Sequence, residues 1–312
     1  MPKSLQVGVV GVGHLGSRHA QIYARLPGVR LVAVCDIDRR RAEALARQLG
    51  CEALTEPHRL IGRVQAASLA APSSLHYPLA STLLEGGIHV LVEKPITTSL
   101  PDAQALIRIA RRRRCVLQVG HVERFNAAFQ AAMKHLRHPR FIEVHRLSPY
   151  PFRGTDVSVA LDVMIHDLDV ILALVRSPAV RLDAVGVPVL SASEDIANAR
   201  IQFASGCIAN LTSSRISDEP VRRIRVFQED RYLSIDTLAQ TVRLAVKTPR
   251  GIRRAHLPVN RQAPLEAELA AFIRSVRTGS APLVSGEDGT AALALALRIE
   301  RAMRRNRRHA HA

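Results

Sequence analysis

The sequence predicts an α/β protein: a parallel sheet wound with helices, followed by an α+β domain built on an open, largely antiparallel sheet. Strand-like and helical segments alternate through the first 120 residues, a glycine-rich loop follows the first strand, and consecutive strands dominate after residue 120. We therefore expect an N-terminal domain at 1–120 and a C-terminal domain at 121–312, and we allow that the C-terminal helix packs back on the first domain.

Length and composition restrict the class of protein. A chain of 312 residues with 47% hydrophobic residues is long enough for two packed domains and too apolar to be disordered. No run approaches the ~18 uncharged apolar residues of a membrane span. The glycine-rich loop interrupts the N-terminal apolar run, which argues against a signal peptide. The four cysteines have no CxxC spacing, so we expect a reduced, cytoplasmic protein without membrane insertion.

Apolar and β-branched runs alternate with helical patterns in the first domain. Asp38 is the expected N-cap of one helix, Pro101 lies in the first turn of another, and Gly86 and Gly87 end a third. Such alternation is typical of βαβ units and a parallel sheet. The predicted strands cover 5–10, 29–35, 65–71, 88–92 and 115–119, and the predicted helices cover 14–26, 38–49, 75–85 and 100–113.

The pattern changes after residue 120, where several strands follow one another without crossover helices. This order favours an antiparallel or mixed sheet. A loop containing prolines is expected at 148–155. The predicted helices cover 123–136, 158–175, 263–278 and 286–304, and the predicted strands cover 140–146, 180–189, 196–204, 208–213, 222–228, 232–236 and 241–245.

The loop Gly11-Val12-Gly13-His14-Leu15-Gly16 has the GxGxxG pattern between a predicted strand and a predicted helix. In a Rossmann domain, Gly11 would allow the tight turn, Gly13 the approach of a pyrophosphate, and Gly16 the close packing of helix on strand. Asp36 ends the second strand, where its carboxylate can accept hydrogen bonds from ribose hydroxyls. The pattern therefore predicts a dinucleotide cofactor.

The choice between the two nicotinamide cofactors depends on residues 36–41. Asp36 favours NAD, because a carboxylate repels the 2′-phosphate of NADP. Arg39, Arg40 and Arg41 follow and could accommodate that phosphate, although they fall on the exposed side of the helical pattern. We expect NAD, with NADP as the alternative.

The net charge of +17 indicates an anionic partner or an arginine-rich solvated surface. Of the 44 basic residues only Lys3, Lys94, Lys134 and Lys247 are lysines. Aromatic residues make up 4% of the chain and tryptophan is absent, so stacking platforms for nucleic-acid bases are poorly supplied. We therefore expect a phosphorylated small molecule or a solvated surface, and no nucleic acid.

Further motifs lie in order along the chain: Ala71-Pro72 followed by His76, the triplet Glu93-Lys94-Pro95, and the pair Asp162 and His166. With the glycine loop, this ordered set resembles the Gfo/Idh/MocA oxidoreductases over essentially the whole chain. The resemblance implies a Rossmann domain followed by a substrate domain with an open sheet, and a homo-oligomer. It also implies the cofactor-binding residues Gly11, Gly13, His14, Leu15, Gly16, Asp36, Ala71, Pro72, His76 and Glu93.

The same resemblance suggests catalytic roles for Lys94, Asp162 and His166, and no catalytic metal. Oxidation of an alcohol needs a base for the hydroxyl proton while hydride leaves the carbon. Lys94 follows a parallel strand, at the edge where such sheets bind ligands, and can hydrogen-bond the reacting oxygen. His166 is implied as the acid/base and Asp162 as its assistant or a substrate contact. For Asp167, Asp169 and His121, functional and structural roles both stay open.

The segments 120–126 and 162–169 resemble the subgroup that oxidises the 3-hydroxyl of UDP-N-acetylglucosamine, a step toward an amino sugar of lipid A made with an aminotransferase. Lys94, Arg124, Asn126, Asp162 and His166 would then contact substrate, although Arg124 and Asn126 could instead cap a helix. Ala127 stands where proline is commoner in that subgroup. The alternatives are another sugar or inositol dehydrogenase and a non-catalytic dinucleotide-binding regulator.

Overall fold

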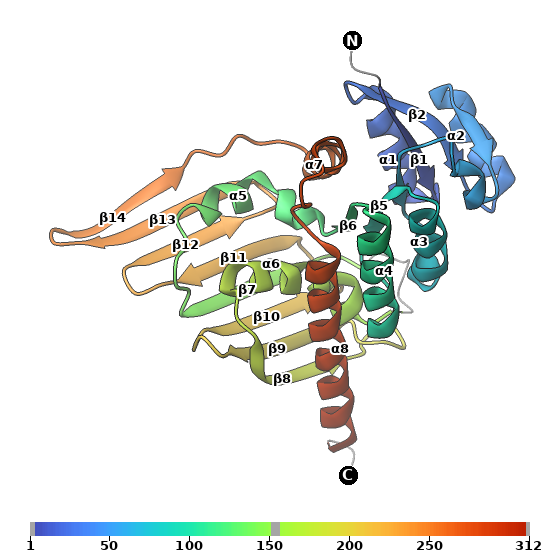
Figure 1. Cartoon of the computed structure of the whole chain (residues 1–312). Coiled ribbons are helices and arrows are strands. Elements are labelled where there is room, and N and C mark those ends of the chain that lie inside the picture. The colour runs from blue at the N-terminus through green and yellow to red at the C-terminus, as the bar shows by residue number, and fades with distance from the viewer. Residues whose placement is uncertain (1–3, 151–156, 310–312) are drawn as a thin grey trace. The chain divides into compact units, whose positions relative to one another are not determined.

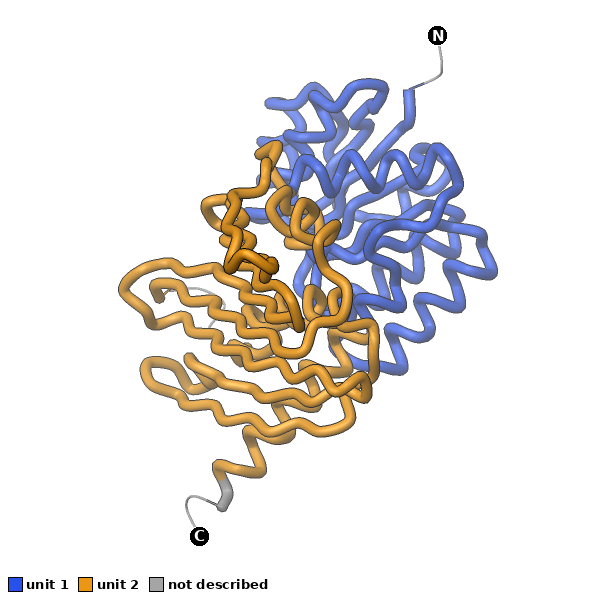
Figure 2. The backbone as a smooth tube through the Cα atoms, turned by 90° about the vertical axis from the view of Figure 1, so that its left-hand side faces the viewer, with its two compact units in different colours: residues 1–121, 265–290 blue, residues 122–264, 291–312 orange. Residues whose placement is uncertain are grey.

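The computed structural model describes residues 4–150 and 157–309. The chain divides into two compact units (Figure 2). Unit 1 comprises residues 1–121 and 265–290, and unit 2 comprises residues 122–264 and 291–312. The first unit thus takes in residues 265–290, which follow the second unit's strands in the sequence.

Unit 1 contains a six-stranded sheet in the order β3-β2-β1-β4-β5-β6, with every neighbouring pair parallel (Figure 1). This order and direction confirm the predicted Rossmann sheet. The strands are β1 (Leu5–Val10), β2 (Val29–Cys35), β3 (Glu52–Leu54), β4 (Ala66–Leu69), β5 (His89–Glu93) and β6 (Leu117–Gly120). The sequence prediction omitted β3, because three residues are too few to produce a periodic pattern.

The helices of unit 1 confirm the predicted alternation. They are α1 (His14–Arg25), α2 (Arg39–Leu49), α3 (His76–Glu85), α4 (Leu100–Arg113) and α7 (Pro264–Thr278), with short 3-10 turns η1 (Pro57–Leu60) and η2 (Ser73–Leu75). Asp38 caps α2 as expected, because its side chain accepts a hydrogen bond from the backbone N–H of Arg41. Side chains of α1, α2 and α7 share one hydrophobic core with β1, β2, β4 and β5.

Unit 2 contains an eight-stranded sheet in the order β14-β13-β12-β11-β7-β10-β9-β8 (Figure 1). Only β7 and β10 pair in parallel among its described neighbours, so the expected largely antiparallel sheet is confirmed. The strands are β7 (Phe141–Leu147), β8 (Ala179–Val187), β9 (Ile196–Phe203), β10 (Ile208–Ser214), β11 (Val221–Phe227), β12 (Arg231–Asp236), β13 (Thr241–Thr248) and β14 (Gly251–Leu257). The prediction omitted β14, whose residues are nearly all exposed and show no alternation of apolar side chains.

Helices cover one face of the second sheet, where their side chains share a core with the strands. They are α5 (Ala127–Met133), η4 (Ala160–Met164), α6 (Ile165–Val175) and α8 (Gly286–His309). The short 3-10 turn η3 (Val122–Phe125) lies against α5 and α6. Two predicted helices are each divided in the structure: 123–136 breaks at Asn126, and 158–175 begins with the π-helical turn η4. Part of the predicted loop 148–155 lies outside the described residues. None of the helices in the described part of the chain has the length and apolarity needed to cross a membrane.

Candidate active site

The glycine loop between β1 and α1 is shaped by backbone contacts. Gly11 has φ of +81°, and a Cβ there would lie 2.7 Å from the backbone of Ala70 and Ala71. A Cβ on Gly16 would lie 1.8 Å from the carbonyl oxygen of Gly11. A Cβ on Gly13 would meet no protein atom within 4 Å. Two glycines therefore permit the fold of the loop, whereas Gly13 leaves space in front of it.

The first turn of α1 faces a surface cavity of about 530 Å³. Gly13 precedes the helix and offers no capping side chain, and no acidic residue lies in the first turn. The backbone N–H groups at this end are therefore suited to an anion. His14 lines this cavity, together with Arg41, which the sequence analysis considered for a 2′-phosphate, and with three residues that it did not name: Ser17, Arg18 and Gln21.

Asp36 is buried directly after β2, where its carboxylate holds the glycine loop. Its Oδ2 accepts a hydrogen bond of 2.8 Å from the backbone N–H of Val12, and its Oδ1 accepts one of 2.9 Å from Asp38. The Arg41 guanidinium lies 3.7 Å from the same carboxylate, whereas Arg39 is exposed and pairs with Glu43. Only Arg41 of the three arginines lines the cavity.

His76 joins the loop after β4 to the loop after β5. Its Nε2 lies 2.9 Å from the carbonyl oxygen of Ala71, and its Nδ1 lies 2.8 Å from that of Pro95. A neutral imidazole carries one N–H and can donate to only one of these oxygens. Burial lowers the pKa of His76, and the two carbonyl contacts partly oppose that shift. The structure thus brings Ala71, Pro72 and His76 next to the Glu93-Lys94-Pro95 segment.

Glu93 ends β5 with its carboxylate directed inward. Glu93 Oε1 lies 3.3 Å from Nε2 of His19, a fully buried residue of α1, and Oε2 accepts a hydrogen bond from the backbone N–H of Lys94. A Cβ on Gly120 would lie 2.7 Å from this carboxyl group. Glu93 therefore supports the strand end that carries Lys94, which is itself half-buried.

Asp162 and His166 lie in unit 2 at the start of the helix that begins with η4. Asp162 is in the π-helical turn and His166 is in the first turn of α6, and both are half-buried. Spacing of four residues keeps the two side chains near one face of the helix. π-helical turns are frequent at functional sites, and the sequence pattern gave no indication of this one.

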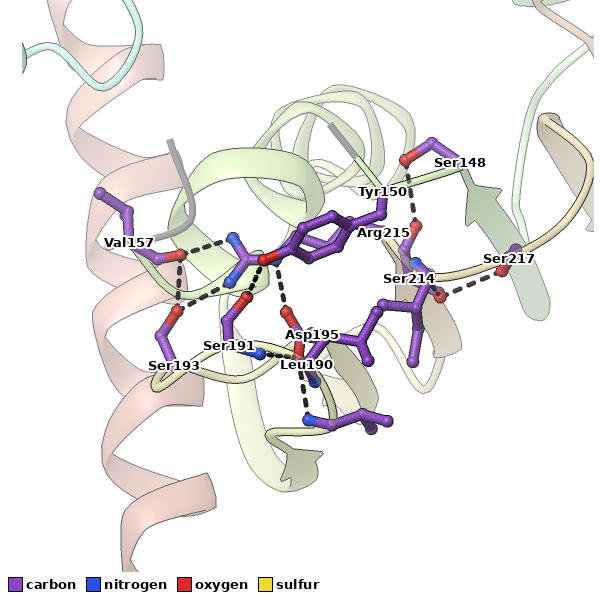
Figure 3. Close-up of polar contacts among 12 residues, drawn as sticks. Ser148, Tyr150, Val157, Leu190, Ser191, Ser193, Asp195, Ser214, Arg215 and Ser217 are labelled. Atoms are coloured by element: carbon purple, nitrogen blue, oxygen red, sulfur yellow. Dashed lines mark hydrogen bonds and ion pairs between the residues drawn. The ribbon is translucent and has the colours of Figure 1, made fainter. Parts of the chain in front are cut away.

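The chain before η4 is held by a buried ion pair that the sequence analysis did not identify (Figure 3). Arg215 is 1% exposed and donates to Asp195 Oδ1 at 2.9 Å, to the Val157 carbonyl oxygen at 2.8 Å and to Ser193 Oγ at 2.8 Å. The other Asp195 oxygen accepts backbone N–H groups from the loop after β8. Although burial by itself raises the pKa of Asp195, these hydrogen bonds outweigh it and lower that pKa.

Asn126 and Arg124 have defined partners within unit 2. Asn126 is 2% exposed, caps α5 through the backbone N–H of Ala128, and donates to the carbonyl oxygen of Thr237. Arg124 donates to Asp169 at 3.2 Å. These contacts give Asn126 the capping role considered from the sequence, and they place Asp169 in an ion pair. His121 is fully buried just after β6.

The residues at the carboxyl edge of the first sheet fit a dinucleotide. The loop has open space only at Gly13, the uncapped turn of α1 can bind phosphate oxygens, and Arg18 and Arg41 supply positive charge. Asp36 lies where a ribose can be bound. Among the described residues, no group of three or more His, Cys, Asp or Glu side chains could hold a metal ion.

This fold and site define a dinucleotide-binding oxidoreductase. Residues 5–121 match the family description "Oxidoreductase family, NAD-binding Rossmann fold", and residues 118–234 match the Gfo/Idh/MocA C-terminal domain. The chain belongs to the Gfo/Idh/MocA family, as the ordered motifs predicted, and its first unit is an NAD-binding Rossmann domain.

Characterised relatives extend over nearly the whole chain. The protein is 36% identical over 306 residues to UDP-N-acetylglucosamine 3-dehydrogenase of Acidithiobacillus ferrooxidans, covering 95% of this chain and 96% of the relative. A solved structure of that enzyme superposes with a TM-score of 0.91 over 96% of this chain and 97% of the other. Myo-inositol 2-dehydrogenase of Thermotoga maritima is 27% identical over 97% of each chain.

Proposed function

We propose that the protein oxidises the 3-hydroxyl of UDP-N-acetylglucosamine to a ketone, with NAD as the hydride acceptor. The observation that carries this proposal is the full-length similarity to the Acidithiobacillus enzyme, at 36% identity and a TM-score of 0.91. The arginine-rich composition also suits a diphosphate, which arginine binds through paired N–H groups.

The cofactor part of the proposal uses the edge of the first sheet. The turn of α1 after Gly13 would bind the pyrophosphate with help from Arg18 and Arg41, and Asp36 would bind the adenosine ribose. His14, Leu15 and the Ala71-Pro72 loop fixed by His76 would complete this surface. When bound, NAD supplies an acceptor for the hydride that leaves the sugar carbon.

The catalytic part of the proposal gives three side chains the tasks of removing the hydroxyl proton and binding the reacting oxygen. His166 would accept the hydroxyl proton as the carbon loses hydride, and Asp162 would orient His166 or contact the sugar. Lys94 would hydrogen-bond the reacting oxygen as negative charge develops on it. Lys94 and Arg124 would also contribute to substrate binding, whereas the buried amide of Asn126 would act by holding the start of α5.

A direct test is incubation of the purified protein with NAD and UDP-N-acetylglucosamine in the presence of a ketone trap. Mass analysis should show a trapped product whose sugar has lost two hydrogens. Substrate deuterated at C3 should transfer its deuterium to the reduced cofactor, and substrate deuterated at C4 should not. Transfer from C4 alone would disprove the regiochemistry while leaving sugar oxidation in place.

The alternative within the family is oxidation of an inositol, supported by the full-length similarity to the Thermotoga inositol dehydrogenase. Myo-inositol and scyllo-inositol should therefore be assayed beside the nucleotide sugar under the same conditions. Turnover of an inositol with none of UDP-N-acetylglucosamine would replace the proposed substrate.

The remaining parts of the proposal concern the cellular setting. A 3-keto nucleotide sugar suits an aminotransferase that would form the 3-amino sugar of lipid A, and the proposed location is the cytoplasm.

We also propose a homo-oligomer formed through the uncovered face of the second sheet. Phe141, Phe227 and Tyr232 form a row there with ring centroids 5.6 and 4.9 Å apart. Light scattering during gel filtration measures the mass, and a monomeric mass would disprove assembly.

A further inference from the structure

Three ionisable side chains from three separate elements meet in the interior of unit 2. Arg146 lies on β7 and is 6% exposed, Asp167 lies on α6 and is 1% exposed, and Glu123 lies on η3 and is 5% exposed. Arg146 donates to both carboxylate oxygens of Asp167 at 2.8 Å and to Glu123 Oε1 at 2.9 Å. We call these three residues the Arg146 cluster.

We propose that Arg146 is a positioning residue for His166, which precedes Asp167 directly in the chain. Arg146 would fix the first turn of α6 so that the imidazole keeps the orientation that proton transfer requires. This inference rests on the proposed function, because it assigns His166 the role of acid/base.

The geometry favours orientation because two parallel N–H···O bonds fix the plane of the Asp167 carboxylate as well as its position. Asp167 and His166 share one helical turn, so a shift of one backbone position moves the other. A second ion pair, between Arg124 and Asp169 at 3.2 Å, joins η3 directly to α6. With the bonds from Arg146 on β7 to Asp167, α6 is held at two positions, which resist its rotation better than one.

A contribution to stability does not by itself explain why the three side chains of the Arg146 cluster are buried. Removing charges from water is costly, and replacing a whole buried ion cluster by apolar side chains often leaves a protein as stable or more stable. Burial favours the neutral form of Arg146, but the carboxylates of Asp167 and Glu123 outweigh it and raise the pKa of Arg146. The guanidinium of Arg146 therefore stays charged, whereas burial raises the pKa of Asp167 against the opposing effect of Arg146. Apolar replacements would lack the directional bonds of the cluster.

The test compares two variants of the Arg146 cluster with one control variant, all made in the full-length protein. Arg146→Lys keeps the charge but cannot form the paired bonds to Asp167 together with the bond to Glu123. The triple variant Glu123→Met, Arg146→Met and Asp167→Leu replaces the cluster with apolar side chains. The matched control is Arg307→Met, which removes a half-exposed ion pair with Glu194 from the same unit.

Both cluster variants should bind NAD within about twofold of wild type, because the cofactor site lies in the other unit. Their kcat should fall by about 10- to 100-fold with a smaller change in KM, as expected for a misplaced catalytic group. The primary deuterium isotope effect on kcat, measured with substrate deuterated at the oxidised carbon, should rise as proton and hydride transfer become rate-limiting. Arg307→Met should match wild type in all of these measurements.

Wild-type kcat and isotope effect in a folded triple variant would overturn the inference and leave the cluster a structural role. If the triple variant does not fold, Arg146→Lys decides by the same criteria, and Glu123→Gln replaces it if that variant also unfolds. Absence of wild-type turnover on UDP-N-acetylglucosamine would refute the proposed function instead. The variants would then be compared on whichever sugar or inositol the wild type oxidises.

Discussion

A substitution at Gly13 can separate the two roles of the glycine loop, which are to form the fold and to bind the cofactor. A Cβ added at Gly13 meets no protein atom within 4 Å, and the φ of −65° is open to alanine. Gly13→Ala should therefore destabilise the protein by no more than about 1 kcal/mol, the usual cost of alanine at an N-cap. The same methyl group would stand in front of the phosphate-binding turn. Loss of one hydrogen bond to a charged group, worth about 1.5–3 kcal/mol, would weaken NAD binding roughly 10- to 150-fold.

Gly16→Ala is the matched comparison, because its Cβ would lie 1.8 Å from the Gly11 carbonyl oxygen. The loop must shift, at a cost of about 1–3 kcal/mol or more, so both the melting temperature and NAD affinity should fall. Calorimetry measures the dissociation constant and thermal unfolding measures stability for both variants. Unchanged NAD affinity in a folded Gly13→Ala protein would refute the assignment of this loop to the pyrophosphate.

Three further predictions concern the proposed site. Lys94→Ala and His166→Ala should each lower turnover by orders of magnitude with nearly unchanged NAD affinity in calorimetry, and full turnover in both would exclude their catalytic roles. Asp36→Ala should weaken NAD more than NADP in the same assay, and equal losses would remove the specificity argument. Because burial lowers the pKa of His76, the unfolded state binds more protons, so stability should fall as pH drops through about 6.5. The free energy of unfolding of His76→Gln should decline less steeply over that range, and parallel pH profiles would disprove this contribution.

Structural features that depend on residues close together in the chain were predicted correctly from the sequence. The alternation of segments identified the parallel sheet, and Asp38 marked the start of α2 through its capping preference. Strands β3 and β14 escaped prediction because one is too short for a pattern and the other is exposed on both faces. The sequence pattern also failed to predict the π-helical turn around Asp162, because the hydrogen bonding of such a turn depends on packing as well as on composition.

The motifs predict which segments form the site, whereas the contacts of each side chain appear only in the structure. Glu93 and Asp167 are each adjacent in the chain to a proposed catalytic residue, Lys94 and His166 respectively. Both carboxylates are buried beside a nitrogen-bearing side chain from a different element, His19 at 3.3 Å for Glu93 and Arg146 at 2.8 Å for Asp167. Because their partners are distant in the sequence, spacing alone could not distinguish ligand contact from support. At both positions a half-buried side chain with a proposed reacting role stands beside a buried acidic neighbour that fixes its backbone. The Arg146 variants test this relation at His166.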